Sequence, residues 1–516
     1  MVALLGVSRG LTLLFSSSRS FTTSSLDDSN LFSYTTGGFA FGNYRDSLDG
    51  LDLYINSSQV YQEIDGYGAA MTDSSAYLLG NMKSKDSGVY NDLMDYLFDR
   101  KTGLQILRVT LGSSDFSLQT YDFAPNQDYD TAATMAQRGD VDSLLKNFSI
   151  DEAKKQLIPV LLDAKQRNPQ LKIMLSPWSP PKWTKSSNQY GGGSLRGGFE
   201  DTLAEYYART LKSFSDAGLK PWAITLQNEP THNAAYPSML MSPSTQVTVA
   251  QSLKSKLATY GGADIKIIAH DNNFDVWSDA ANVVNNAGNS VDGVGFHCYN
   301  GQASQVSSYI ASVSSNGNGN KDIHMTECSG VDTNESRWGS MNWWLNNIFY
   351  PMAKLNGRSA IAWNLALDPG YGPRLSSAYC SNCKGVVTLS SPQNFMDPWL
   401  KLESQILLMN HFSTASTDLS FLGGGKARRI GMQVNYKFSD SGNSNACLNA
   451  AAFAAPLQGS VLSPPSKDNQ APATKRVGLV LTNSCSSTQV IAMALDGRAS
   501  YYGVEPGVSS LVWTAP

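Results

Sequence analysis

Residues 222–230 read Trp222-Ala-Ile-Thr-Leu-Gln-Asn-Glu-Pro230, a short apolar and β-branched run that ends in polar residues. A run of this kind, followed by a helix-length amphipathic stretch, is typical of a strand in a parallel α/β unit. Eight such units follow one another, with strands expected at 64–70, 106–111, 172–178, 222–228, 266–271, 291–299, 321–327 and 359–367. Eight consecutive units predict a (β/α)8 barrel, whose active site lies at the carboxyl ends of the strands.

The segments between these strands have the spacing of amphipathic helices. Three of them, Asp151–Arg167, Asp201–Ala217 and Ser242–Tyr260, begin with Asp or Ser, which are favoured helix N-caps. In the last of these Pro243 follows the cap, where the missing N–H of proline costs nothing. Strands and helices therefore alternate throughout the predicted barrel.

The pattern changes after the barrel. A last amphipathic helix is expected from Asp397 to about Phe412, and short alternating segments follow at 429–438, 476–482, 488–495 and 509–514. These segments predict an antiparallel β-sandwich. A strand-like stretch at 51–55 is expected to join it. We therefore divide the chain into a targeting segment (1–25), an N-terminal segment joining the sandwich (26–62), the barrel (63–412) and the C-terminal sandwich domain (413–516).

Composition narrows the class of ligand. The 516 residues carry a net charge of -4, with no basic surplus that would attract nucleic acid or anionic lipid. No apolar run is long enough to span a bilayer, so we expect no integral membrane association. A neutral or weakly charged ligand and a monomeric protein are the expectations that remain.

The first 25 residues have the composition of a targeting segment, because the first acidic residue is Asp27 and short apolar runs alternate with serines. Arg9 interrupts the apolar region, so an organelle transit peptide competes with a secretory signal. An even number of cysteines and glycosylation sequons at Asn56, Asn147 and Asn334 favour secretion to an extracellular location.

The six cysteines are expected to form disulfides. Cys380 and Cys383 have the spacing of a redox or zinc half-site, but no second pair stands near them, so a local disulfide is favoured. Strand alternation points Cys298 and Cys328 outward from neighbouring strands, where a disulfide is conceivable, and this leaves Cys447 to pair with Cys485. The five histidines have no metal-ligand spacing, so neither a metal nor a cofactor is expected.

Two glutamates stand at strand ends. Glu229 follows the fourth predicted strand and Glu327 ends the seventh, so both should lie on the catalytic face of the barrel. A single glutamate at such a place is usually solvated or salt-bridged. Cleavage of a glycosidic bond requires two carboxyl groups, one to protonate the leaving oxygen and one to act at the anomeric carbon. The pair therefore predicts a glycoside hydrolase.

Several motifs, each at the end of its own predicted strand, resemble glycoside hydrolase family 30 over residues 64–387. They are Gly66-Tyr-Gly-Ala-Ala-Met-Thr-Asp-Ser74, Arg108-Val-Thr-Leu-Gly-Ser-Ser-Asp-Phe-Ser117, Ser176-Pro-Trp-Ser-Pro-Pro-Lys-Trp183, Asn228-Glu-Pro230 and His297-Cys-Tyr299. The resemblance implies a retaining enzyme in which Glu229 is the acid/base and Glu327 the nucleophile. It also implies that Asn228 binds the sugar 2-hydroxyl, and that further side chains shape the pocket or flank the nucleophile, namely Asp115, Trp178, Trp363, His297 and Tyr299.

The residue types agree with these roles. The indoles of Trp178 and Trp363 are expected to stack on a sugar ring, with core packing as the alternative. By strand alternation Tyr299 shares a face with His297, so its hydroxyl is expected to hold Glu327 ionised. Arg108 is expected to support the carboxylates as a nearby positive charge.

Loop sequences bear on the substrate. The stretches at 191–195, 235–238 and 372–388 most resemble the fungal endo-β-1,6-glucanase branch, so cleavage of β-1,6-glucan is the favoured function. An endo-β-1,6-galactanase and a glucosylceramidase of the same family are the alternatives. A barrel that binds a glycan without cleaving it is the alternative from a different class.

Overall fold

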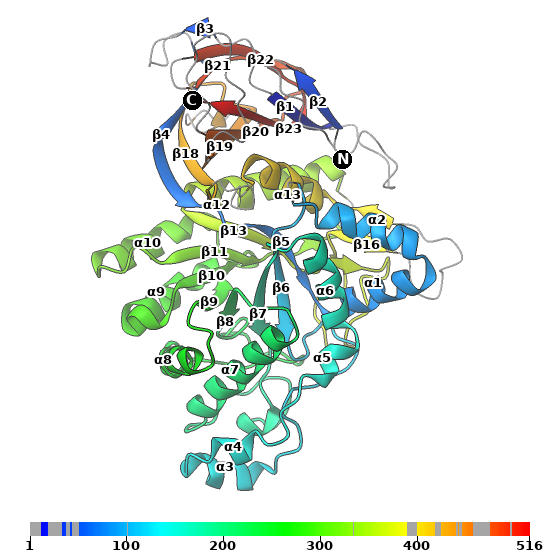
Figure 1. Cartoon of the computed structure of the whole chain (residues 1–516). Coiled ribbons are helices and arrows are strands. Elements are labelled where there is room, and N and C mark those ends of the chain that lie inside the picture. The colour runs from blue at the N-terminus through cyan, green and yellow to red at the C-terminus, as the bar shows by residue number, and fades with distance from the viewer. Residues whose placement is uncertain are drawn as a thin grey trace.

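A computed structural model describes residues 12–18, 33–37, 42–43, 51–100, 102–333, 335–389, 400–417, 425–439, 442, 446–457, 475–495 and 498–515. Figure 1 shows a barrel ringed by helices, with a sheet domain above it in this view. The first and last described strands, β1 (Thr12–Ser18) and β23 (Gly507–Ala515), lie in the sheet domain.

The barrel consists of eight parallel strands that close in the order β10-β11-β13-β5-β6-β7-β8-β9. Every predicted strand overlaps one of them, which confirms the (β/α)8 fold. The strands are β5 (Gly66–Met71), β6 (Ile106–Leu111), β7 (Lys172–Pro177), β8 (Ala223–Thr225), β9 (Lys266–Asn273), β10 (Gly293–His297), β11 (Asp322–Glu327) and β13 (Gly357–Ala362). The shortest, β8, ends three residues before the predicted end at Asn228, because the backbone turns there.

The helices that follow the strands are α1 (Asp73–Lys85), α2 (Ser87–Leu97), α3 (Tyr129–Gln137), α4 (Val141–Leu144), α5 (Asp151–Lys155), α6 (Leu157–Arg167), α7 (Glu200–Asp216), α8 (Pro243–Thr259), α9 (Trp277–Ala287), α10 (Val306–Ser315), α11 (Arg337–Trp344) and α12 (Tyr350–Lys354). The predicted cap of α8 is confirmed, since the Ser242 hydroxyl accepts a hydrogen bond from the N–H of Thr245. Asp151 and Asp201 are not caps, because each lies in the first turn of its helix, α5 beginning at Asp151 and α7 at Glu200. The predicted helix 151–167 is two helices separated at Gln156.

The sheet domain is one ten-stranded sheet in the order β2-β1-β23-β20-β19-β18-β4-β21-β22-β3. The pairing of β21 with β4 is parallel and the other pairings are antiparallel, so the predicted antiparallel sheet domain is confirmed. Side chains of β4, β18, β20 and β21 meet in one apolar cluster. The strands are β1 (Thr12–Ser18), β2 (Ser33–Gly37), β3 (Gly42–Asn43), β4 (Leu53–Glu63), β18 (Arg428–Val434), β19 (Leu448–Pro456), β20 (Lys475–Asn483), β21 (Gln489–Leu495), β22 (Arg498–Val504) and β23 (Gly507–Ala515).

The segment expected to be a targeting sequence is described only in part. β1 lies within it and pairs with β23. The rest of residues 1–25, like the sequon residue Asn334, lies outside the described residues. The assignment of a targeting role to this segment stays a prediction.

Helix α13 (Ser404–Ala415) joins the two domains. It was expected to be amphipathic and to begin near Asp397, but β17 (Leu400–Leu402) precedes it, and all twelve helical residues are buried. The reason is that α13 packs on both domains. The ring of Phe412 contacts Tyr67 of β5 on one side and Phe453 of β19 on the other, with centroid separations of 5.4 and 6.2 Å.

Three disulfides are present, Cys298–Cys328, Cys380–Cys383 and Cys447–Cys485, which confirms each predicted pairing. Four short strands lie near the first two pairs, β12 (Gly330–Val331), β14 (Ala366–Leu367), β15 (Cys383–Lys384) and β16 (Val387–Leu389). Among the described residues, no helix has both the length and the apolar character needed to cross a membrane.

Candidate active site

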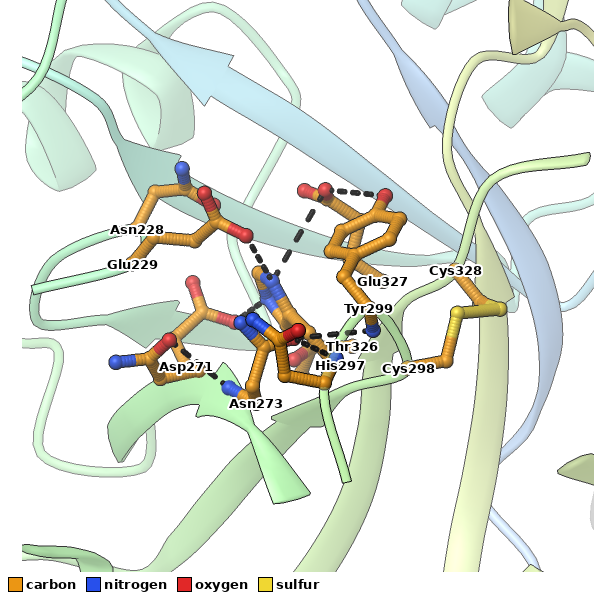
Figure 2. A network of polar contacts seen from close by, with 12 residues as sticks. Asn228, Glu229, Asp271, Asn273, His297, Cys298, Tyr299, Thr326, Glu327 and Cys328 are labelled. Atoms are coloured by element: carbon orange, nitrogen blue, oxygen red, sulfur yellow. Dashed lines mark hydrogen bonds and ion pairs between the residues drawn. A yellow bond between two sulfur atoms is a disulfide. The ribbon is translucent and has the colours of Figure 1, made fainter. Parts of the chain in front are cut away.

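Side chains from several strand ends meet at one end of the barrel, as Figure 2 shows. Glu229 and Glu327 face each other there, with His297 between them. An oxygen of each carboxylate and a ring nitrogen of His297 all lie within 4.8 Å of one another. The Glu229 side chain is 12% exposed and the Glu327 side chain 6%, so both open only slightly to solvent. The structure thus brings together the two glutamates that the sequence singled out.

The position of Glu229 depends on an irregular backbone after β8. The N–H of Asn228 donates to the carbonyl of Pro177, at 2.8 Å, and the N–H of Glu229 donates to that of Asp271, at 2.9 Å. Glu229 and Asp271 have φ angles of 44° and 50°, in the left-handed region that residues other than glycine avoid. Such a conformation costs about 1–3 kcal/mol and persists where surrounding contacts enforce it, often at functional sites.

Glu327 receives two strong hydrogen bonds. Arg108 Nη1 donates to its Oε2 at 2.6 Å, and the Tyr299 hydroxyl donates to its Oε1 at 2.7 Å. Both donors favour the ionised carboxylate, and the bond from arginine is also an ion pair. The predicted contact between Tyr299 and Glu327 is therefore present, and Arg108 binds the carboxylate directly.

Arg108 also binds Asp271, which the sequence reasoning missed. Its Nη2 donates to Asp271 Oδ2 at 2.8 Å, to Asn228 Oδ1 at 2.9 Å and to Ser176 Oγ at 3.0 Å. Both partners of this ion pair are buried, with side-chain exposures of 1% and 0%. Asp271 ends a predicted strand, and this position was the one sequence signal that could have placed it in the site. Its role as the partner of Arg108 is shown only by the structure.

His297 lies between three carboxylates. Its Nδ1 is 3.2 Å from Glu229 Oε1 and 4.0 Å from Glu327 Oε1, and its Nε2 is 3.1 Å from Asp271 Oδ1. Burial lowers the pKa of His297, but Glu327, Asp271 and Glu229 together outweigh burial and raise this pKa to about 9. His297 is therefore a cation at neutral pH. It was expected beside Glu327, and it lies closer to Glu229.

The pKa values of the two glutamates are shifted in opposite directions. Burial raises the pKa of Glu229, but the hydrogen bond and the charge of His297 outweigh it and lower this pKa. For Glu327, burial and the charge of Glu229 raise the pKa, and they outweigh the opposite effects of His297 and Arg108. The ionisation of the site is thus shared among Glu229, Glu327 and His297.

Strand alternation does not explain why Tyr299 points into the site, because β10 ends at His297, two residues earlier. The N–H of Tyr299 donates to Asn273 Oδ1 at 3.0 Å, which fixes the turn beyond the strand. The disulfide between Cys298 and Cys328 lies to the right of Tyr299 in Figure 2 and joins the residues that follow His297 and Glu327.

The two predicted pocket tryptophans lie next to Arg108. The rings of Trp178 and Trp363 stack on each other with centroids 4.9 Å apart, and only 2% and 4% of these residues is exposed. The Arg108 guanidinium lies 4.6 Å from the Trp178 ring. The indoles thus pack face to face. Asp115, also buried, lies in the loop after β6 and belongs to the electrostatic surroundings of both glutamates.

Two groups of described residues have atoms spaced closely enough to share a metal ion. One is the Glu229, His297 and Glu327 group itself, in which His297 is a cation and would repel a metal. The other is Asp65, Asp322 and His324. Its two aspartates are already in ion pairs with Lys172, Lys266 and Arg358. Neither arrangement favours a metal.

A model of the glycosyl hydrolase family 30 TIM-barrel domain matches residues 64–401. The chain belongs to glycosyl hydrolase family 30.

This family 30 chain is similar to fungal proteins of known name. It is 29% identical over 355 residues to endo-1,6-beta-D-glucanase neg1 of Aspergillus fumigatus, which covers 65% of this chain and 68% of that protein. It is 28% identical over 359 residues to an endo-1,6-beta-D-glucanase of Trichoderma harzianum, with 66% and 68% covered. The lysosomal acid glucosylceramidase of Mus musculus is 31% identical over a shorter match, 35% of this chain and 34% of that protein.

Solved structures extend the likeness to the whole family 30 chain. A structure described as an endo-beta1,6-glucanase has a TM-score of 0.76 at 21% identity and covers 98% of this chain and 99% of its own. At this identity the match establishes the fold alone.

Proposed function

We propose that this family 30 glycoside hydrolase cleaves β-1,6-glucan by double displacement, with Glu327 as nucleophile and Glu229 as acid/base. The observation that carries the proposal is the separation of the two glutamates, whose oxygens approach within 4.8 Å. Retaining glycosidases hold their two carboxyl groups about 5 to 5.5 Å apart, whereas inverting ones hold them about 6.5 to 9.5 Å apart to admit a water. The arrangement therefore supports retention.

The reaction has two steps. A Glu327 oxygen attacks the anomeric carbon, the bond to the leaving oxygen breaks, and Glu229 gives that oxygen a proton. Water then attacks the same carbon, Glu229 takes the proton of the water, and the ester bond to Glu327 breaks. The sugar is released with its original anomeric configuration.

Hydrogen bonds support this division of roles. Glu327 has two donors, at 2.6 and 2.7 Å, which favour the ionised form that a nucleophile needs and oppose the rise in its pKa that burial and Glu229 cause. Glu229 has one contact, at 3.2 Å, with cationic His297. The proton that the leaving group requires is then held by the pair Glu229 and His297. The catalytic cycle requires that the Glu229–His297 pair together holds this proton, and either residue can carry it in the free protein.

Asp115 supports the binding of a sugar. Burial and the charges of Glu327 and Glu229 raise the pKa of Asp115 well above its usual range, which favours the protonated form of the side chain. Its buried Oδ1 has no hydrogen-bond partner among the described residues. A buried polar atom without a partner is costly, and a sugar hydroxyl would satisfy it. Trp178, Trp363 and Asn228 lie in the same site and complete the proposed pocket.

The choice of β-1,6-glucan draws on the fungal endo-1,6-beta-D-glucanases, which match about two thirds of this chain. The glucosylceramidases that also match make glucosylceramide the second candidate, and β-1,6-galactan the third. Incubation with a linear β-1,6-glucan, β-1,6-galactan, glucuronoxylan and glucosylceramide separates them. Activity confined to the last three would refute the proposal.

The catalytic roles have their own test. We expect Glu229→Gln to slow hydrolysis of β-1,6-glucan by about 10²- to 10⁴-fold, the usual contribution of a general acid. The same variant should keep its first-turnover burst of fluoride release from a β-glucosyl fluoride, whose leaving group needs no proton, although steady turnover slows because Glu229 also takes the proton of the water. Glu327→Gln should lose the burst as well. Proton NMR of the first product should show the β-anomer. An α-anomer would exclude retention, and a first-turnover rate that falls equally on both substrates in Glu229→Gln would refute its role as acid.

We further propose that the protein is secreted as a monomeric glycoprotein after removal of residues 1–25. Its three disulfides and the exposed sequon residue Asn147 support an oxidising, extracellular environment. Mass spectrometry of the protein recovered from culture medium should show a new N-terminus near residue 26 and a glycan on Asn147. An intact N-terminus on intracellular protein would contradict this.

A further inference from the structure

Tyr379 is a large aromatic side chain that is 65% exposed next to the active site. Its ring packs edge-on against His232 and Tyr236, with centroid separations of 5.7 and 5.6 Å, and the rings of His232 and Tyr236 are 6.0 Å apart. We call these three residues the aromatic wall. Two loops contribute to it, one after β8 and one after β13.

The aromatic wall lies on the Glu229 side of the site. The N–H of His232 donates to the carbonyl of Glu229 at 2.8 Å, so both residues belong to one turn. His232 and Tyr236 are also close enough to Glu229 to interact with its charge. Because a general acid stands beside the leaving group, a surface on the flank of Glu229 faces the leaving-group sugar.

The loop that carries Tyr379 is held firmly. Cys383 is bonded to Cys380 and packs in one apolar cluster with Trp178, Trp363 and Tyr236. Strand β15 pairs with β12, and Asn382 exchanges hydrogen bonds of 2.9 and 3.0 Å with the backbone of Asp332. A ring that is fixed before binding loses little entropy when a ligand covers it.

We propose that the aromatic wall is the subsite for the leaving-group sugar of the glucan, and that Tyr379 binds this sugar by stacking on its apolar face. The inference rests on the proposed function. An exposed tyrosine by itself is ordinary. Tyr379 differs because its ring is buttressed on one side by two other rings, is fixed by a disulfide, and stands beside a proposed catalytic acid.

The same subsite receives an acceptor in the second half of the reaction. When a sugar hydroxyl replaces water, its oxygen bonds to the anomeric carbon, the ester bond to Glu327 breaks, and Glu229 takes the hydroxyl proton. Binding on Tyr379 therefore controls transfer to an acceptor and leaves hydrolysis by water untouched.

The experiment uses β-glucosyl fluoride as donor, which has one sugar ring and a one-atom leaving group, with a β-1,6-linked glucose disaccharide as acceptor. For Tyr379→Ala we expect unchanged fluoride release without acceptor, and a ratio of transfer to hydrolysis lowered by up to about tenfold, as the loss of one aromatic stack implies. Tyr379→Phe should restore the ratio. Tyr501→Ala, which removes an exposed ring from the sheet domain, should behave as wild type.

An unchanged ratio in Tyr379→Ala, or an equal fall in fluoride release and transfer, would overturn the inference. Failure of the proposed function gives a different result, because the wild-type protein would then not cleave β-1,6-glucan. His232 is unsuitable for this test, since its charge acts on Glu229 and its removal would change the acid itself.

Discussion

Arg108 determines the charge balance of the site at the scale of single residues. It is fully buried and donates to both Asp271 and Glu327. Buried charges are tolerated when they are paired and hydrogen-bonded, and become costly when one partner is removed. The guanidinium of Arg108, on β6, thus links Glu327 directly to Asp271 and to Asn228, the residue before Glu229.

We expect Arg108→Met to lower the free energy of unfolding by about 3–5 kcal/mol, because Asp271 and Glu327 would be left as uncompensated buried charges. Urea unfolding followed by tryptophan fluorescence measures this loss. A second change, Asp271→Asn, should recover part of it. Arg167→Met is the matched control, since its partner Asp95 is 67% exposed, and it should cost about 0–1 kcal/mol. Equal losses in both variants would contradict the assignment.

Tyr299→Phe tests the donor to Glu327. The hydroxyl stabilises the ionised carboxylate, so its removal should raise the pKa of Glu327 further above its ordinary value. Activity requires ionised Glu327 and falls as pH drops through this pKa. The acid limb of the pH profile of kcat/KM should therefore move to higher pH in the variant. A limb at the wild-type position would show that the hydroxyl does not act on Glu327.

At the scale of elements, the ends of β10 and β11 are joined by Cys298–Cys328, beside Tyr299 and Glu327. Replacing both cysteines with serine should cost about 2–4 kcal/mol of stability. It should also lower kcat, because the two strand ends lose their covalent link. The Cys447–Cys485 pair is a matched control, with a sequence separation of 38 against 30 but a position in the sheet domain. Its removal should reduce the melting temperature with kcat unchanged, and a similar fall in kcat would refute the special role of the first pair.

The elements that sequence patterns predicted well are those with local signals. All eight barrel strands were found, because each is a short buried run that is followed by polar residues and then by a helix-length stretch. Strand β19 was missed, because its sequence Leu448-Asn-Ala-Ala-Ala-Phe-Ala-Ala-Pro456 is rich in alanine, a weak strand former. Helix α13 was placed too early and with the wrong exposure, since its burial depends on two domains that meet around it.

At the scale of the whole molecule, the barrel and the sheet domain share one apolar core. The barrel cluster includes Ala451, Phe453, Val480 and Val508, which belong to the sheet domain. Contact of this extent makes the two domains depend on each other for stability. Their separate appearance in Figure 1 does not imply separate unfolding.

We expect one cooperative thermal transition, in which activity and circular dichroism are lost together. Phe453→Ala, which removes the ring that contacts Phe412 of α13, should destabilise by about 3–5 kcal/mol and move both signals equally. Leu479→Ala, in the core of the sheet domain itself, should also move both. Two transitions, or a loss of sheet signal while activity persists, would show that the domains unfold independently.

The sequence by itself determined the fold class, the two glutamates and the disulfide pairs, because these follow from patterns repeated along the chain and from the face that each strand residue takes. Only the tertiary structure decided that Arg108 joins Glu327, that Asp271 belongs to the site and that Tyr379 meets His232. Arg108 and Glu327 are 219 residues apart. Contacts over such separations depend on how the barrel closes and how its strands are registered, which no local pattern specifies.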